Sequence, residues 1–238
     1  MTYRNITISI VLYLFLIISS ASAQFGIKTG PGISDIAFLK EGQTPYVGYE
    51  INSLEHRKPM AVFQAGAYGT INISKRIDFQ PELLYVMQGL NYGTNYIYDD
   101  IKYKLIIQYL QMPLLLKYNL SIRKRKHSGL IAGPYASWKL NAVRITEVEG
   151  LRNKTSVTNL KDTDFGVIAG YAFEFKLPSG QMMIELRCGY SLVNMMNRID
   201  GYIPDYYGPS KEYARNVNIS LIVGYKFLNI WPGKTESK

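Results

Sequence analysis

Three glutamates carry the side chains best suited to acid–base chemistry: Glu82, Glu174 and Glu185. Two carboxyl groups held close together can act as general acid and general base when their surroundings differ. Carboxylates buried inside a folded chain are, however, normally paired with cations, and such pairs are structural. The elements that carry these glutamates therefore decide between the two interpretations.

The two histidines suggest a second chemistry, that of a protease or a lipid-modifying enzyme. His56 follows Glu55, and His127 precedes Ser128. Such catalysis needs a base, a nucleophile and a carboxylate gathered at one site. The predicted strands place His56 in an outward connection and His127 at the opposite, periplasmic end, so the two histidines are far apart. We therefore predict a protein that is not an enzyme, with no catalytic, cofactor-binding or metal-binding residues and no cofactor.

A two-residue hydrophobic period runs through most of the chain. In residues 216–227 the apolar side chains fall on alternate positions: Val217, Ile219, Leu221, Val223, Tyr225 and Phe227. This alternation predicts a strand with one apolar face. The sequence shows no amphipathic helices that could pack against such apolar faces, so we expect these faces to contact lipid. Beyond the N-terminus, no apolar run is long enough for a membrane-spanning helix.

Eight alternating segments are predicted as strands: residues 25–33, 60–73, 76–90, 103–120, 128–140, 163–176, 181–194 and 215–227. A closed antiparallel barrel needs an even number of strands, because no unpaired edge can face hydrocarbon. The predicted fold class is therefore all-β: an eight-stranded antiparallel transmembrane β-barrel, the smallest common size of outer-membrane barrel.

The predicted connections alternate in length. Long ones cover residues 34–59, 91–102, 141–162 and 195–214, and short ones cover 74–75, 121–127 and 178–180. Outer-membrane barrels have long extracellular loops and short periplasmic turns. We therefore expect the long connections outside the cell and both chain ends in the periplasm.

The alternation also assigns a face to each side chain of the sixth and seventh strands. The lipid face takes Phe165, Val167, Ala169, Tyr171, Phe173, Phe175, Ile184, Leu186, Cys188, Tyr190 and Leu192. The interior takes Asp164, Gly166, Gly170, Glu174, Lys176, Glu185, Arg187, Gly189 and Ser191, together with Glu82, Lys117, Lys139 and Lys226. Side chains fill a barrel of eight strands, so these charges should neutralise one another and leave no diffusion channel.

Two features predict irregular strands. The segment Ile106 to Leu116 is apolar on both faces, which favours a bulge. Pro81, Pro113 and Pro134 each fall inside a predicted strand, where proline removes a ladder donor. We expect a local band of bulges or strained pairing at these three prolines.

The N-terminus predicts export. Arg4 precedes an apolar stretch over residues 6–18, and the Ala-x-Ala pattern ends at Ala23. This pattern is typical of a signal peptide (1–23) cleaved after Ala23, whereas the apolar stretch is short for the alternative, an uncleaved anchor. The barrel domain would cover residues 24–227. Residues 228–238 would form a short periplasmic tail, either an interfacial plug or disordered.

The net charge limits which partners are expected, and the cysteine count limits disulfide formation. The chain has a net charge of +9 and a single cysteine, so an intrachain disulfide is excluded. An exported basic chain meets anionic headgroups before it meets nucleic acid, so we expect membrane lipids and lipopolysaccharide as partners, and no nucleic acid. Part of the excess lies in residues 123–126, which fit a solvated turn, or else a contact with a headgroup or a partner.

Six residue strings resemble the outer-membrane β-barrel domain family often labelled PorT-like: FGIKTG at 25–30, FQPELLY at 79–85, YLQMPLLLKY at 109–118, GLIAGPY at 129–135, DFG at 164–166 and VGYKF at 223–227. The resemblance covers nearly all of the chain after the signal peptide and implies an outer-membrane barrel, and it brings no catalytic residues with it. The family takes its name from a component of a protein-secretion and gliding apparatus.

The expected function is a structural or interaction barrel in the outer membrane of a Gram-negative bacterium, not a general diffusion porin. Its long connections are rich in tyrosine: Tyr92, Tyr96, Tyr98, Tyr202, Tyr206, Tyr207 and Tyr213. Tyrosine suits partner contacts but is also common in the interfacial girdles of barrels. The alternatives are an accessory component of a PorT-type secretion system and a lipid-modifying enzyme. The barrel-assembly machinery is an expected partner during biogenesis, and envelope proteins are possible partners of the loops.

Overall fold

The computed structural model describes residues 24–40, 58–96, 99–122, 126–148, 150–158, 160–195 and 212–227. The predicted signal peptide (1–23), the tail (228–238) and His56 lie outside the described residues, as do residues 123–125 and most of the first and last long connections. Predictions that fall on these residues stay predictions.

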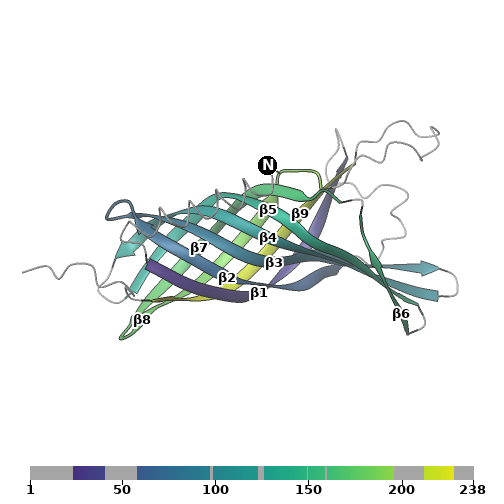
Figure 1. Cartoon of the computed structure of the whole chain (residues 1–238), viewed down its shortest axis with the longest axis horizontal. Helices are drawn as coiled ribbons and strands as arrows, with labels where there is room; N and C mark the ends of the chain where they lie inside the picture. The colour runs from purple at the N-terminus through teal and green to yellow at the C-terminus, as the bar shows by residue number, and fades with distance from the viewer. Residues whose placement is uncertain are drawn as a thin grey trace, which may run out of the picture.

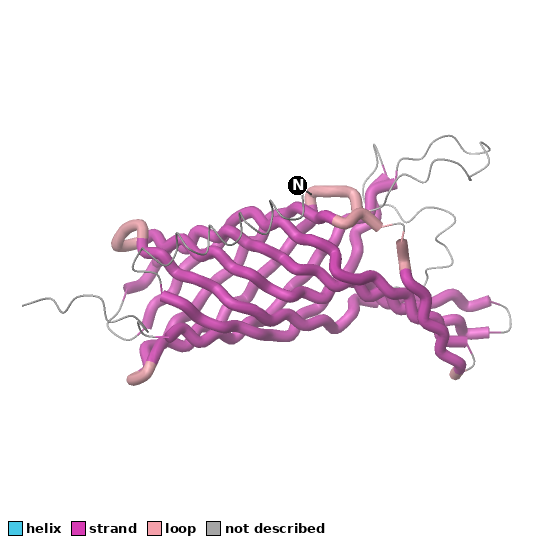
Figure 2. The backbone as a smooth tube through the Cα atoms, viewed as in Figure 1, coloured by secondary structure: helices cyan, strands magenta, loops and turns pink. Residues whose placement is uncertain are grey.

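The described residues form nine strands: β1 (Gln24–Lys40), β2 (Lys58–Asn72), β3 (Ile77–Tyr96), β4 (Asp99–Ile122), β5 (Lys126–Val148), β6 (Leu151–Ser156), β7 (Thr163–Leu177), β8 (Gly180–Ser191) and β9 (Glu212–Phe227). They form one antiparallel sheet in the order β4-β3-β2-β1-β9-β8-β7-β5-β6. A further pairing between β4 and β5 closes eight of the strands into a barrel, in which the strands are tilted to the barrel axis (Figure 1; Figure 2). The ninth strand, β6, pairs with β5 outside this ring. The predicted fold is confirmed.

The two ends of the barrel differ. At one end, here called the turn end, β2 and β3 are joined by residues 73–76, and β7 and β8 by residues 178–179. β1 begins and β9 ends at the turn end, because Gly26 pairs with Lys226. The opposite end, here called the hairpin end, carries the long connections.

Two predicted loops are strands, which corrects the sequence analysis. β3 and β4 continue as a hairpin to the pair Tyr96 and Asp99, and β5 continues to Val148 and pairs with β6. Residues 91–96, 99–106, 141–148 and 151–156 thus form a sheet that projects beyond the barrel at the hairpin end, here called the extended sheet (Figure 1). Backbone hydrogen bonds between its strands stabilise the extended sheet. Because this sheet has no need of a continuous apolar face, its sequence does not alternate strictly between apolar and polar residues.

The band of bulges expected at the prolines is wrong. The strand register does not shift at Pro81, Pro113 or Pro134, since the residue pairs before and after each proline follow the same register. The register of β4 against β5 shifts instead between Gln108 and Tyr109, where Leu140 of β5 is the extra residue. The bulge therefore lies on β5, opposite the segment 106–116 that the sequence predicts to hold it. Other shifts lie near Pro59 on β2 and near Ser121 on β4.

The assignment of faces holds along the barrel. The large apolar side chains on its exterior form what we call the apolar belt: Ile27, Ile33, Phe63, Leu116, Leu130, Leu140, Phe165, Val167, Phe173, Leu186, Leu192, Ile219, Leu221 and Val223. Cys188 is also exposed on this surface. Lys176 corrects the assignment, because it lies at the end of β7 beside the turn and is exposed. A continuous apolar exterior around a closed barrel fits hydrocarbon, not water. Within the described residues, no helix has the length and apolar character needed to cross a membrane.

Candidate functional site

The interior of the barrel brings the predicted charged residues together. Five side chains form what we call the central ion network: Lys28, Gln80, Glu82, Glu185 and Arg187. They come from β1, β3 and β8, which are not neighbours in the ring, so the contacts cross the lumen. The charged side chains of this network are at most 3% exposed.

Arg187 holds both carboxylates of the central ion network. Its Nη1 and Nη2 donate to Oε2 and Oε1 of Glu82 at 2.8 and 2.7 Å, a bidentate geometry, and Nη2 lies 2.5 Å from Oε2 of Glu185. Lys28 Nζ lies 2.7 Å from Glu82 and 3.1 Å from Glu185. Gln80 Nε2 donates to the same two carboxylates. Two cations thus balance two anions.

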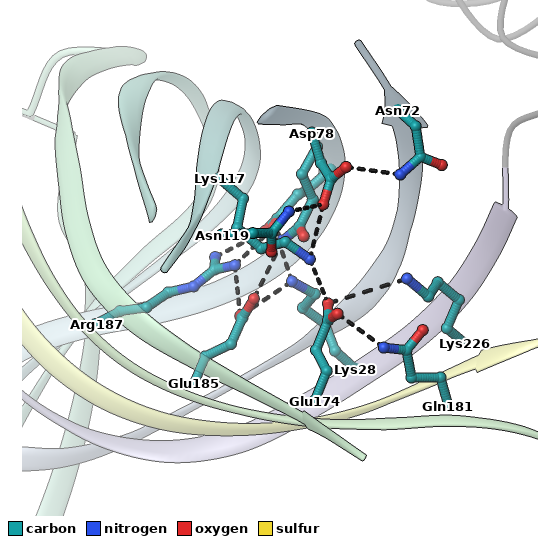
Figure 3. Close-up of polar contacts among 12 residues, drawn as sticks. Lys28, Asn72, Asp78, Lys117, Asn119, Glu174, Gln181, Glu185, Arg187 and Lys226 are labelled. Atoms are coloured by element: carbon teal, nitrogen blue, oxygen red, sulfur yellow. Dashed lines mark hydrogen bonds and ion pairs between the residues drawn. The ribbon is translucent and has the colours of Figure 1, made fainter. Parts of the chain in front are cut away.

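A second group, here called the turn-end ion network, lies next to the short turns, since Asn72 ends β2 and Asp78 follows the start of β3. Figure 3 shows its contacts. Lys117 Nζ lies 2.6 Å from Glu174 and 3.1 Å from Asp78, and Lys226 Nζ lies 3.9 Å from Glu174. Amides complete it, since Gln181 donates to Glu174 while Asn72 and Asn119 donate to Asp78. Again two cations face two carboxylates.

These contacts decide what the three candidate glutamates do. Glu82 and Glu185 lie together, but both are held by Lys28 and Arg187, and Glu174 belongs to the other network. A pair of buried carboxylates whose oxygens are taken up by two shared cations is a structural ion network and is poorly suited to general acid–base catalysis. The prediction that inward carboxylates pair with inward cations is confirmed for these three glutamates, but not for Asp164.

The half of the lumen nearer the hairpin end has a different carboxylate. Asp164 is 2% exposed and accepts hydrogen bonds from Ser191 at 2.5 Å, Asn216 at 3.1 Å and Tyr135 at 3.4 Å. All three donors are neutral, and in the part of the chain that the structure describes no lysine or arginine forms an ion pair with Asp164. This carboxylate depends on hydrogen bonds rather than on a counter-ion.

Beyond Asp164 the lumen is filled by apolar side chains, here called the hairpin-end cluster: Ile36, Leu90, Ile107, Tyr109, Ala142, Leu160, Met195 and Ala214. Leu160 and Met195 come from segments between strands that fold inward. Lys161 N donates to the Met195 carbonyl at 2.8 Å, and Met195 N donates to the Ala214 carbonyl at 2.9 Å. Lys139 anchors the same segment through the Leu160 carbonyl and the Asp162 carboxylate.

Some of these residues could have been found from the sequence and some could not. Lys28, Asp78 and Gln80 occupy inward positions of the same alternation that places Glu82 inside. Two tyrosines needed the structure, because Tyr68 and Tyr135 lie across glycines on the adjacent strands. A β-carbon at Gly26 would come within 2.4 Å of the Tyr68 ring, and one at Gly166 within 2.5 Å of Tyr135. The Tyr68 ring in turn receives the Lys28 ammonium 4.3 Å from its centre.

The second candidate chemistry finds no assembled site among the described residues. His127 lies at the start of β5 at the turn end, as predicted. Within the described ranges no group of three or more His, Cys, Asp or Glu side chains could hold a metal ion.

The family follows from a match over most of the chain. Residues 19–197 match the model of the family described as outer membrane protein beta-barrel domain. The chain belongs to this family. The resemblance read from its residue strings is therefore confirmed at the level of the family, and the protein is a β-barrel of the outer membrane; its PorT-like character stays a prediction.

Three solved structures illustrate the similarity. Neisserial surface protein A (NspA) is 11% identical with a TM-score of 0.41, over 87% of this chain and 98% of that chain. OprG from Pseudomonas aeruginosa is 14% identical with a TM-score of 0.39, over 87% and 97%. Ail, the attachment invasion locus protein of Yersinia pestis, is 10% identical with a TM-score of 0.36, over 86% and 99%. No curated protein matches the chain.

Proposed function

We propose that this barrel is a membrane-embedded scaffold that presents its extended sheet to partners in the cell envelope, and that it is not a general diffusion porin. The filled lumen is the observation that carries this proposal. From the turn end to the hairpin end, the lumen holds the turn-end ion network, the central ion network, Asp164 with its donors, and the hairpin-end cluster. Solute pores need wider barrels.

The extended sheet supports the interaction part of the proposal. β6 pairs with β5 along one edge, all six of its side chains are exposed, and Leu151 is 78% exposed. A rigid barrel that carries such a sheet resembles other scaffolds whose functional contacts lie on projecting segments. An exposed strand edge can also accept a strand from a partner. We propose that the hairpin end faces the cell exterior and that both termini are periplasmic.

Site-specific photo-cross-linking in intact cells tests the proposal. A photoreactive residue in place of Leu151 should form adducts with envelope proteins, because it projects from β6. The matched control replaces Leu186, an exposed leucine of the apolar belt, and should give lipid adducts only. Protein adducts that are equally frequent at both positions, or absent at Leu151, would contradict a docking role for the extended sheet.

A shortened variant provides a second test of the same role. Replacing residues 93–102 and 144–155 each by Asn-Gly would join the pairs Tyr92 with Tyr103 and Val143 with Ser156 through two-residue hairpin turns. The variant should still fold as a barrel, measured by its slower migration after heating, and should lose the partner adducts. An accessory role in protein secretion remains an alternative; it predicts co-purification with large envelope proteins, whereas a monodisperse monomer would count against it.

A further inference from the structure

The outer face of the extended sheet carries four exposed cations, here called the cationic patch: Lys102 and Lys104 on β4, and Arg152 and Lys154 on β6. Register places them in two adjacent rows across the sheet. Lys104 and Lys154 flank Ile145 of β5, and Lys102 and Arg152 flank Glu147. With strands about 4.8 Å apart, the four side chains originate within roughly 12 Å of one another.

This face is the direct continuation of the lipid-facing surface. Ile107 points into the lumen, so Ile106, Lys104 and Lys102 point outward, on the same side of β4 as Leu116 of the apolar belt. Lys104 lies two residues beyond Ile106, or about 7 Å along a tilted strand. The headgroup layer on each side of a bilayer is about 5–7 Å thick. Ile106 is the last apolar residue on the outward face of β4, so we take it as the edge of the hydrocarbon, which puts the start of the cationic patch at the height of the lipid headgroups.

Among the side chains that the structure describes on this face, positive charge exceeds negative charge. Among its described side chains Glu147 is the carboxylate, and Arg152 Nε donates to it at 2.9 Å. In the part of the chain that the structure describes, Lys102, Lys104 and Lys154 have no carboxylate partner. Like charges side by side on a sheet repel one another, so an external anion at this position would stabilise the arrangement.

We propose that the cationic patch binds the phosphate groups of lipid headgroups in the leaflet around the hairpin end. Lysine suits this role because its flexible apolar stem can lie along the lipid while the ammonium reaches a phosphate. Clusters of cations at the membrane surface are a recurring mode of recognition of anionic lipids. The inference goes beyond the scaffold role, since it needs neither a sealed lumen nor a protein partner.

Binding of diphosphoryl lipid A to the folded protein in a zwitterionic detergent, followed by native mass spectrometry, tests the proposal. The patch variant carries Lys102→Gln, Lys104→Gln and Lys154→Gln. The control variant carries Lys75→Gln, Arg76→Gln and Lys176→Gln, which remove the same charge from exposed positions at the turn end. Lipid A without its phosphates serves as the ligand control. Retention of the heat-dependent gel shift confirms that each variant is folded.

The wild type and the control variant should bind the phosphorylated lipid, and the patch variant should bind it about a hundredfold more weakly, since each of its three lost cations contributes roughly fivefold. Added salt should reduce this difference. Equal binding by the patch variant, an equal loss in the control variant, or equal binding of the lipid without phosphates would each overturn the proposal.

Discussion

Between the short turns and the middle of the barrel, the lumen holds four carboxylates and four cations, whereas towards the hairpin end it holds Asp164 and a cluster of apolar side chains. In the first region every contributing side chain comes from a strand whose register is fixed on both sides. In the second, Leu160 and Met195 come from segments between strands. Ion pairs need the precise placement that the ladder supplies, while apolar packing tolerates less regular backbone.

The comparison predicts that charge removal does most damage in the turn-end half. Glu82→Gln leaves Lys28 and Arg187 facing Glu185 alone and should lower the free energy of unfolding by about 3–5 kcal/mol, because a buried cation loses its partner. Urea unfolding in detergent micelles, followed by tryptophan fluorescence, measures this loss.

Asp164→Asn is the matched control in the other half. The neutral donors around Asp164 leave no buried cation unpaired, so this substitution should cost about 1 kcal/mol or less. If the two substitutions destabilised the protein equally, the electrostatic distinction between the two halves would be wrong.

Truncation of an apolar side chain should be most costly at the hairpin end. Ile107→Ala in the hairpin-end cluster leaves a cavity and should cost about 2–5 kcal/mol in the same unfolding experiment. Leu116→Ala on the lipid-facing side of the same strand should cost less, because lipid refills the space. A larger loss at Leu116 than at Ile107 would show that the cluster does not fill the lumen.

The exterior shows which parts of this architecture the sequence could predict. Lipid outside and side chains inside impose a two-residue period, so eight strands and the faces of residues such as Val167 and Glu185 follow from alternation. The partners of Glu82 do not, because Lys28 and Arg187 meet it only after the ring closes with a particular register. β6 escaped prediction because its side chains are all exposed and mostly polar, so nothing in their hydrophobicity marks a strand.

Charge on the exterior should be tolerated in one region and not in the other. Ile219→Arg in the apolar belt should hinder insertion by about 2–4 kcal/mol if it lies near the bilayer midplane. Leu151→Arg, at an apolar and still more exposed position on β6, should change stability by about 0.5 kcal/mol or less. The fraction of protein folded after refolding into lipid vesicles measures both, and similar losses would place the extended sheet inside the membrane.

The smallest expected effect concerns the segment that packs into the hairpin end. Lys139→Met removes the donor to the Leu160 carbonyl and the ion pair with the largely exposed Asp162, and should cost about 1 kcal/mol. Faster amide exchange confined to residues 160–162 would locate the effect. Lys154→Met, on the exposed β6, should leave that exchange unchanged; a global loss of protection in Lys139→Met would instead make this contact part of the barrel core.

Conductance of the purified protein in planar lipid bilayers tests the filled lumen most directly. Because the two ion networks and the hairpin-end cluster occupy the interior in series, we expect insertion without steady single-channel steps across the usual range of voltage and salt. Long-lived steps of uniform size that scale with salt concentration would reveal a continuous aqueous path and contradict this account.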